Sequence, residues 1–160
     1  LKNSKVPMIR RHIGVVFQDF KLLPTLTVYE NVAFALEVTE EHPKYIKKKV
    51  METLELVGLK HKARMLPTEL SGGEQQRVSI ARSIVNTPQV VIADEPTGNL
   101  DPDTSWEIMN IFEEINLRGT TVVMATHNKD IVNTIRHRVI AVEGGRIVRD
   151  EQRGEYGYEA

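Results

Sequence analysis

The sequence predicts an α/β domain with a largely parallel sheet and an inserted helical lobe. From the middle of the chain onward, segments with the pattern of strands alternate with segments with the pattern of helices, which is typical of a layered α/β fold. Residues 90–93 form an apolar run without alternation, as expected for a parallel strand covered on both faces. Residues 18–77 have a mostly helical pattern instead, so we expect them to form a lobe inserted between strands.

Composition limits the classes of protein that fit this sequence. At 160 residues the chain is long enough for one domain with a real core, or for part of one. A net charge of −1 with 27% charged residues gives no reason to expect nucleic acid or an anionic membrane as the main partner. Cysteine is absent, which excludes disulfides and thiolate metal sites and is compatible with a reducing compartment.

A membrane-spanning helix is not expected from the sequence. The longest stretch without a charge, residues 83–93, has 11 residues, well below the ~18 apolar residues that indicate a spanning helix. Any membrane role is therefore expected to come through a partner. The sequence begins at Leu1 and shows no apolar signal segment, which suggests a fragment.

The first predicted elements are a strand and a helix. Residues 12–17 are rich in strand-forming types and predict a strand that leads into a loop at Gln18. Thr27 and Glu30 have the spacing of a capping box, in which each side chain bonds the backbone N–H of the other residue. This spacing predicts a helix from Thr27 to about residue 38.

A second helix and a connector are expected next. Apolar residues recur at helical spacing after Pro43, and Gly58 suits the position just past the end of the helix. Residues 59–70 have no clear periodicity. We therefore expect a connector there, with Pro67 as a break before a glycine-rich turn.

The middle of the chain combines a capped helix with the apolar strand. Ser71 and Glu74 again have capping-box spacing, and the helix is expected over residues 73–85. The Asn-Thr-Pro sequence at residues 86–88 ends it. Residues 90–93 then form the strand that we expect at the centre of the sheet.

Another helix and strand follow this central strand. Thr104 and Glu107 have capping-box spacing and predict a helix start, and Gly119 closes that helix. Residues 120–125 are rich in β-branched types and predict a strand. Residues 126–128 are expected to form a turn at its C-terminal end.

The last predicted elements are a short helix and a hairpin. The helix is expected over residues 129–135, and the hairpin strands over residues 139–142 and 146–149. Gly144 and Gly145 lie between the strands, where glycine supplies the positive φ that a tight turn needs. The polar tail that follows has little to bury.

Two stretches carry groups suited to binding a phosphate and a metal. Ser71, Gly72 and Gly73 place glycine amides at a helix start, where unpaired N–H groups and the helix dipole stabilise anionic oxygens. Asp94 and Glu95 end the central strand. A carboxylate there can hold Mg²⁺, and the next carboxylate can position or deprotonate an attacking water. The alternative is a capped helix followed by a core strand.

Two further polar residues are predicted to lie near the same edge of the sheet. Ligands of α/β sheets bind at the C-terminal ends of strands. Gln18 follows the first strand, and His127 follows the third. Both are therefore candidates to converge on the site of Asp94 and Glu95.

The chain resembles the nucleotide-binding subunits of ABC-type ATPases over essentially its whole length. Five motifs appear in the order that this family has, which is far more specific than a Ser-Gly-Gly sequence alone. They resemble the Q-loop glutamine, the signature, the Walker B strand, the D-loop and the switch histidine, in that order: Gln18, residues 70–77, residues 90–95, residues 99–101 and His127.

The resemblance implies roles for the signature and the D-loop in a dimer. Ser71 and the amides around Gly72 and Gly73 would contact the γ-phosphate of an ATP bound to the opposite subunit of a head-to-tail homodimer. Glu74 belongs to the same nucleotide-binding motif. Asp101 would lie at the dimer contact.

The resemblance also implies roles in hydrolysis. Asp94 would support Mg²⁺, and Glu95 would be the catalytic carboxylate. His127 would stabilise the γ-phosphate and the attacking water. Gln18 would reach the metal and the water, while its loop reports to a membrane partner; the alternative is a plain loop amide. ATP and Mg²⁺ are the implied cofactors.

One departure from the family outweighs these matches. No Gly-x-x-x-x-Gly-Lys-[Ser/Thr] sequence occurs, and no glycine is directly followed by lysine, so the P-loop that holds the β- and γ-phosphates is absent. We interpret residues 1–160 as the C-terminal part of one ABC ATPase domain and expect this chain alone to be inactive. A smaller departure is Asn128, where many relatives have Asp; Asn still caps a helix.

The resemblance implies a division of the chain into three parts. Residues 18–77 would contain the Q-loop and the mainly helical lobe. Residues 78–150 would form the sheet lobe with the Walker B strand, the D-loop and the switch, and residues 151–160 would be a tail.

Within the ABC family, the resemblance is closest to the bacterial cell-division ATPases. It is carried by residues 16–24, 27–32, 93–102, 133–141 and 154–158. It implies an ATPase on the cytoplasmic face of the bacterial membrane, bound to a transmembrane subunit and controlling peptidoglycan hydrolases. The segment of residues 93–101 is shared with lipoprotein- and macrolide-export ATPases, which stay an alternative.

The same resemblance suggests a surface for the membrane partner and leaves two other classes open. Phe20, Leu22, Leu23 and Tyr29 are the candidate docking residues, unless they pack within the helical lobe. A non-catalytic interaction module would explain the missing P-loop. A DNA-repair or chromosome-structure ATPase would share the signature, but the chain has no long heptad segment between the motifs and no basic stripe.

Overall fold

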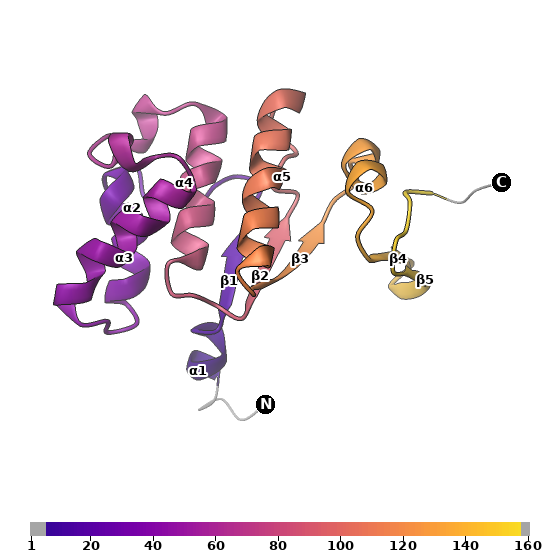
Figure 1. Ribbon diagram of the computed structural model, residues 1–160, viewed down its shortest axis with the longest axis horizontal. Coiled ribbons are helices and arrows are strands. Elements are labelled where there is room, and N and C mark those ends of the chain that lie inside the picture. The colour runs from indigo at the N-terminus through magenta and orange to yellow at the C-terminus, as the bar shows by residue number, and fades with distance from the viewer. Residues whose placement is uncertain (1–5, 158–160) are drawn as a thin grey trace. The chain divides into compact units, whose positions relative to one another are not determined.

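The computed structural model of the chain describes residues 6–157 and divides into two units at Thr126 and His127. The first unit contains, in chain order, α1 (Val6–Arg10), β1 (Ile13–Val16), α2 (Val28–Glu37), α3 (Pro43–Leu56), η2 (Lys60–Lys62), η3 (Pro67–Glu69), α4 (Gly72–Ile84), β2 (Val90–Asp94), α5 (Pro102–Leu117) and β3 (Thr121–Ala125) (Figure 1). The second unit contains α6 (Lys129–Ile135), β4 (Val139–Glu143) and β5 (Arg146–Glu151).

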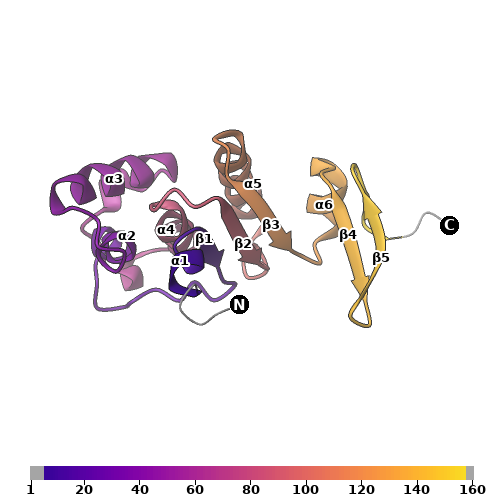
Figure 2. The same cartoon turned by 90° about the horizontal axis from the view of Figure 1, so that it is seen from below.

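The sheet of the first unit has the strand order β1-β2-β3 (Figure 2). Both pairs of neighbouring strands are parallel. The prediction of a parallel strand at the centre of the sheet is therefore confirmed. Gly14 pairs with Val91, and Val16 pairs with Ala93, so these four residues share one face. The three apolar side chains among them are fully buried.

Helix α4 lies directly against β1 on this covered face. A Cβ atom added to Gly14 would lie only 2.4 Å from the carbonyl oxygen of Ser83 in α4. Glycine is therefore needed here for close approach, because any side chain would push the helix off the strand.

The expectation that both faces of the central strand are covered is wrong for this chain. On the other face, Val15, Ile92 and Val123 lie in register and are 41%, 41% and 52% exposed. Helix α4 contacts β1 and helix α5 contacts β3, and the close approach of α4 at Gly14 lies on the opposite, buried face. An apolar run without alternation indicates a buried strand, but it does not say which chain segment covers each face.

Most predicted helix starts are confirmed. Thr27 and Ser71 are the N-caps of α2 and α4, and both form complete capping boxes. The prediction for Thr104 is wrong, because α5 begins one turn earlier, with Asp101 as its N-cap and Pro102 at its first position. The connector at residues 59–70 contains the two short 3₁₀ helices η2 and η3.

The loop before α2 is held by one buried amide. The side chain of Asn31 accepts a hydrogen bond from Leu23 N at 2.8 Å. Its Nδ2 lies 3.1, 2.9 and 3.0 Å from the carbonyl oxygens of Leu23, Leu26 and Thr27. The last part of the loop, from Leu23 to Thr27, is therefore held by this side chain.

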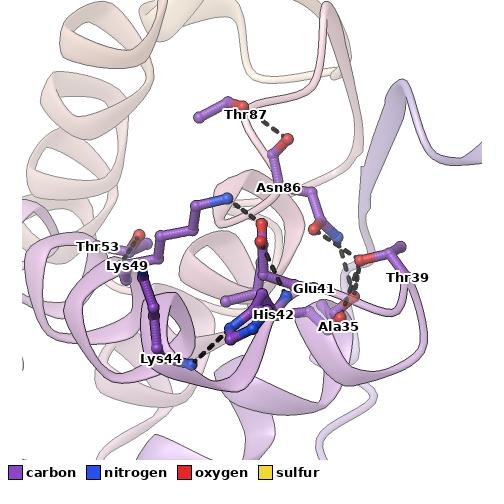
Figure 3. Close-up of polar contacts among 10 residues, drawn as sticks. Ala35, Thr39, Glu41, His42, Lys44, Lys49, Thr53, Asn86 and Thr87 are labelled. Atoms are coloured by element: carbon purple, nitrogen blue, oxygen red, sulfur yellow. Dashed lines mark hydrogen bonds and ion pairs between the residues drawn. The ribbon is translucent and has the colours of Figure 1, made fainter.

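The C-terminal end of α2 is tied to the loop after α4 (Figure 3). Asn86 Nδ2 donates to the carbonyl oxygen of Ala35 at 3.0 Å, and Thr39 Oγ1 donates to Asn86 Oδ1 at 3.1 Å. Glu41 also forms an ion pair with Lys49 of α3. These contacts join the three helices of the helical part to one another.

The second unit contains the short helix and the hairpin that the sequence predicts. Asn128 caps α6 by accepting hydrogen bonds from Asp130 N and Ile131 N. The strands β4 and β5 are antiparallel, and Gly144 and Gly145 have φ of +53° and +76° in the turn between them. None of the helices formed by residues 6–157 has both the length and the apolar character needed to cross a membrane.

Candidate functional site

The central strand ends in the two carboxylates that the sequence singles out. Asp94 is the last residue of β2 and is exposed, whereas Glu95 is partly buried. Glu95 has a φ of +45°, in the left-handed region, which costs a non-glycine residue about 1–2 kcal/mol. Its N–H donates to the carbonyl oxygen of Ala125 at the end of β3 at 2.9 Å, and its own carbonyl oxygen accepts from Gly98 N at 3.0 Å. The main chain thus holds this strained residue in place.

Gln18 lies against the turn that follows Glu95. Its Nε2 donates to Asn99 Oδ1 at 3.3 Å. A Cβ atom on Gly98 would lie 2.9 Å from the same Nε2, so glycine makes room for the glutamine side chain. The structure therefore brings together the segments that follow β1 and β2, as their parallel pairing predicts.

A second glutamine, which the sequence does not single out, bonds the same turn from helix α4. Gln76 is fully buried in α4, and its Nε2 donates to the carbonyl oxygen of Pro96 at 2.7 Å. A buried polar side chain in the apolar stripe of a helix was the available signal, because such groups are nearly always hydrogen-bonded. This signal does not indicate which group accepts the hydrogen bond of Gln76.

Arg82, also in α4, holds the turn that follows Gln18. Its two terminal nitrogens donate to the carbonyl oxygens of Lys21 at 2.7 Å and Phe20 at 3.1 Å. Phe20 and Lys21 have φ of +58° and +49°. Burial lowers the pKa of the Arg82 guanidinium from its ordinary value. In the sequence, Arg82 looks like one of many solvated helix charges.

The N-terminus of α4 is capped by two hydrogen bonds and stabilised by an ion pair. Ser71 Oγ accepts from Glu74 N at 3.3 Å, and a Glu74 carboxylate oxygen accepts from Ser71 N at 3.0 Å. The other oxygen pairs with Lys62 Nζ at 2.5 Å. The hydrogen bond from Lys62, and next the one from Ser71 N, lower the pKa of Glu74. Since the hydroxyl of Ser71 serves there as an acceptor, its hydrogen can still be donated to a ligand.

The two signature glycines have different surroundings. Gly72 is exposed, with Leu100 and Phe20 side chains within 4 Å of where a Cβ would be. Gly73 is buried, and a Cβ there would lie 2.2 Å from Thr104 Cγ2. Gly73 therefore also permits the close approach of α4 and α5. The N–H groups of a first helical turn have no acceptor within the helix and can bind an anion.

Asp101 has a clear structural task in this chain. Its carboxylate accepts from Thr104 N at 2.9 Å and from Thr104 Oγ1 at 2.6 Å. The hydroxyl bond and then the backbone bond lower the pKa of Asp101. The side chain thus begins α5 and is exposed beside the end of the Glu95–Asn99 turn.

His127 belongs to the second unit. It is exposed and directly precedes Asn128, the cap of α6. Its convergence with Gln18 and Glu95 stays a prediction.

The donor set of the first unit suits a magnesium ion that has few protein ligands. Within residues 6–157, no three His, Asp or Glu side chains are grouped so that they could hold a metal by themselves. An exposed carboxylate at Asp94, with Gln18 nearby, matches the way Mg²⁺ keeps water and phosphate oxygens as most of its ligands.

Comparison with known proteins gives consistent matches. A family model described as ABC transporter matches residues 1–98. The cell division ATP-binding protein FtsE of Bacillus subtilis is 75% identical over 157 residues, which are 98% of this chain and 69% of that protein. The FtsE protein of Mycobacterium tuberculosis is 60% identical over 98% of this chain and 68% of its own length.

Solved structures of ATP-binding cassettes share the fold. The dimeric, post-hydrolysis structure of the cassette MJ0796 bound to ADP and Pi is 36% identical, with a TM-score of 0.81 over 98% of this chain and 69% of that one. The structure of cbiO1 from Clostridium perfringens, part of the ABC transporter complex cbiONQ, is 34% identical, with a TM-score of 0.86 over 94% of this chain and 61% of that one.

Proposed function

This chain belongs to the ABC transporter family and, within it, to the cell division ATP-binding proteins FtsE, and from that premise we propose that it hydrolyses ATP with Mg²⁺ when it is part of a complete subunit. The observation that carries the proposal is the Glu95 turn. A carboxylate residue is held there in a strained conformation by backbone bonds, next to Gln18. Strain that the surrounding structure maintains is typical of functional sites.

Four residues would divide the chemistry, three of them in the first unit and His127 in the second. Asp94 would hold the metal, which neutralises charge on the phosphates when bound. Glu95 would take the proton of the attacking water, as a general base. Gln18 would orient that water and contribute a ligand to the metal. His127 would stabilise the γ-phosphate and the water.

The signature would act on a second copy of the subunit. In the proposed homodimer, the Ser71 hydroxyl and the amides of Gly72 and Gly73 would bind the γ-phosphate held by the other subunit, with Glu74 keeping the helix start closed. Asp101 would lie at the dimer contact. The match to a dimeric cassette bound to ADP and Pi supports this arrangement.

We propose a transmembrane partner like FtsX and a role in cell division, at the cytoplasmic face of the bacterial membrane. The ATP cycle would control peptidoglycan hydrolases through that partner. The names of the FtsE relatives support the division role over lipoprotein or macrolide export. The candidate docking residues are partly accessible: Leu23 is 36% exposed, and Phe20, Leu22 and Tyr29 are partly buried.

The domain division is part of the same proposal. Residues 18–77 would form the Q-loop and the mainly helical lobe, and residues 78–150 would form the sheet lobe with the Walker B strand, the D-loop and the switch. Residues 151–160 would be a tail.

Turnover is tested in a protein that has the full length of the relatives and contains this chain, which we call the extended protein. Glu95→Gln should bind Mg-ATP but lose turnover, because an amide cannot accept the proton. ATP binding is measured by titration calorimetry and hydrolysis by phosphate release. Normal hydrolysis by this variant would remove Glu95 from its proposed role.

The 160-residue chain by itself should behave differently. It has no Gly-x-x-x-x-Gly-Lys-[Ser/Thr] sequence, so it should bind Mg-ATP weakly and show little hydrolysis. Robust turnover by this chain would contradict the proposal. If the extended protein also failed to bind Mg-ATP, a non-catalytic interaction module would be favoured.

A further inference from the structure

The turn after Gln18 is strained and is bonded from outside by a side chain of α4. Phe20 and Lys21 are consecutive non-glycine residues with positive φ. Within the turn, Lys21 N donates to the carbonyl oxygen of Asp19 at 2.6 Å. Two adjacent left-handed residues are costly, so the conformation must be maintained by contacts outside the turn.

Arg82 supplies those contacts. Its guanidinium spans the carbonyl oxygens of Lys21 and Phe20, at 2.7 and 3.1 Å. A planar guanidinium presents several donors in a fixed fork, so it can bond two neighbouring carbonyls at once, whereas an ammonium is a point donor. Burial is the cause that lowers the pKa of Arg82, and both terminal nitrogens of its guanidinium bond to the turn.

The conformation of this turn also determines the position of Gln18, which follows β1. Gln18 lies only two residues before Phe20, and its Nε2 reaches Asn99 at 3.3 Å. A chain of contacts therefore runs from α4 through the strained turn to the segment after Glu95. Helix α4 is the same helix that begins at Ser71.

We propose that Arg82 is a positioning residue: by clamping the carbonyls of Phe20 and Lys21, it sets the position of Gln18 over the Glu95–Asn99 turn and ties that position to the signature helix. This proposal rests on the proposed function, because it takes Gln18 to act in hydrolysis.

The test is a double-mutant cycle in the extended protein, with Arg82→Gln, Gln18→Ala and the double variant. If Arg82 acts through Gln18, Arg82→Gln should lower kcat about tenfold with KM for ATP within about twofold. The double variant should then be no slower than Gln18→Ala alone, because the positioned group is already gone. Arg82→Lys, which keeps the charge but not the fork, should restore kcat only in part.

A readout that does not depend on turnover accompanies the cycle. Hydrogen exchange of backbone amides over residues 18–23 should become faster in Arg82→Gln, with exchange in β2 unchanged. The matched control is Arg118→Gln, which removes an exposed arginine paired with Glu114 at the end of α5. It should change neither kcat nor exchange in the turn.

The outcomes separate the two proposals. If Gln18→Ala does not lower kcat, the proposed role of Gln18 fails, whatever Arg82 does. If Gln18→Ala lowers kcat but Arg82→Gln does not, or if the two effects multiply in the double variant, the positioning role of Arg82 is overturned. Unchanged exchange over residues 18–23 in Arg82→Gln would overturn it as well.

Discussion

The turns after β1 and β2 leave the sheet in similar ways but are held by different means. Each contains non-glycine residues in the left-handed region, Phe20 and Lys21 in one and Glu95 in the other. The Glu95 turn is bonded through its main chain to Ala125 in β3, and it accepts a further bond from Gln76 of α4 at the Pro96 carbonyl oxygen. The turn after β1 depends on Arg82, a side chain 61 residues further along the chain.

This difference determines how each turn responds to substitution. Backbone bonds survive most side-chain changes, so the conformation of Glu95 should be robust. The position of Gln18 should be sensitive, because one long side chain on α4 controls it.

The largest expected effect on stability is at Gln76, a side chain that reaches the Glu95 turn from α4. Gln76→Met keeps the volume but loses the 2.7 Å bond to the Pro96 carbonyl oxygen. The free energy of unfolding should fall by about 1 kcal/mol, measured by urea denaturation, because the Pro96 carbonyl oxygen loses its donor while methionine also removes the buried Gln76 Oε1, which has no partner among the described residues. Gln75→Met, which loses a longer 3.3 Å bond from a half-buried site, is the control and should lose less.

Gly98→Ala should break the contact between the two turns from the opposite side. The added Cβ would lie 2.9 Å from Gln18 Nε2, so the glutamine side chain must move. Because the end of a flexible side chain yields easily, stability should change by less than about 0.5 kcal/mol. Turnover of the extended protein should fall about fivefold, since the displaced group is misplaced for reaction. Unchanged turnover would mean that Gln18 need not touch this turn.

Substitution of Glu95 tests whether its strain is stored in the folded state. Asparagine tolerates the left-handed region better than most residues, so Glu95→Asn should raise the free energy of unfolding by about 0.5–1 kcal/mol relative to Glu95→Gln. Both variants should lack turnover. Equal stabilities of the two variants, measured by thermal and urea unfolding, would argue against stored strain.

The last expected effect depends on pH and concerns the N-terminal end of α4, which is held by an ion pair. The pKa of Glu74 is lowered mainly by Lys62 and next by Ser71 N. A carboxylate whose folded-state pKa is depressed adds stability above its unfolded pKa, about 4.3, and this contribution is lost as the pH falls through the folded pKa. Glu74→Gln keeps the capping box but loses the charge. It should therefore be less stable than the parent by at most about 1 kcal/mol at pH 7, with the difference vanishing in acid. A difference that persists at low pH would show that packing, not charge, is involved.

Sequence patterns predicted the local features of the fold well. Thr27 and Ser71 begin helices as expected, and Gly144 and Gly145 form the hairpin turn. These features depend on residues within four positions of one another, so the interactions that determine them can be predicted from a short sequence. The order of the three parallel strands also explains why Gln18 meets the segment after Glu95.

The helix start at Thr104 was predicted wrongly for a reason that was visible in the sequence. Asp101 is a strong N-cap residue and precedes Pro102, which favours the first helical position. Together these two signals outweigh a Thr-x-x-Glu spacing one turn later.

The contacts made by α4 could not be predicted. Arg82 and Gln76 bond backbone carbonyl oxygens of residues that lie 61, 62 and 20 positions away. Every residue type has a carbonyl oxygen, so no sequence pattern marks the partner. Lys62, which pairs with Glu74, is likewise one lysine among many until the fold brings it to α4.

The four close contacts of Asn31 have a mechanical consequence for the segment between the Phe20–Lys21 turn and α2. A loop whose backbone is bonded at both ends to one buried amide has no slack, and it can neither lengthen nor buckle without losing a buried hydrogen bond. The segment therefore forms a rigid connection between α2 and the Phe20–Lys21 turn. A push that shifts α2 is passed on to the turn that carries Gln18 as a displacement, instead of being absorbed on the way.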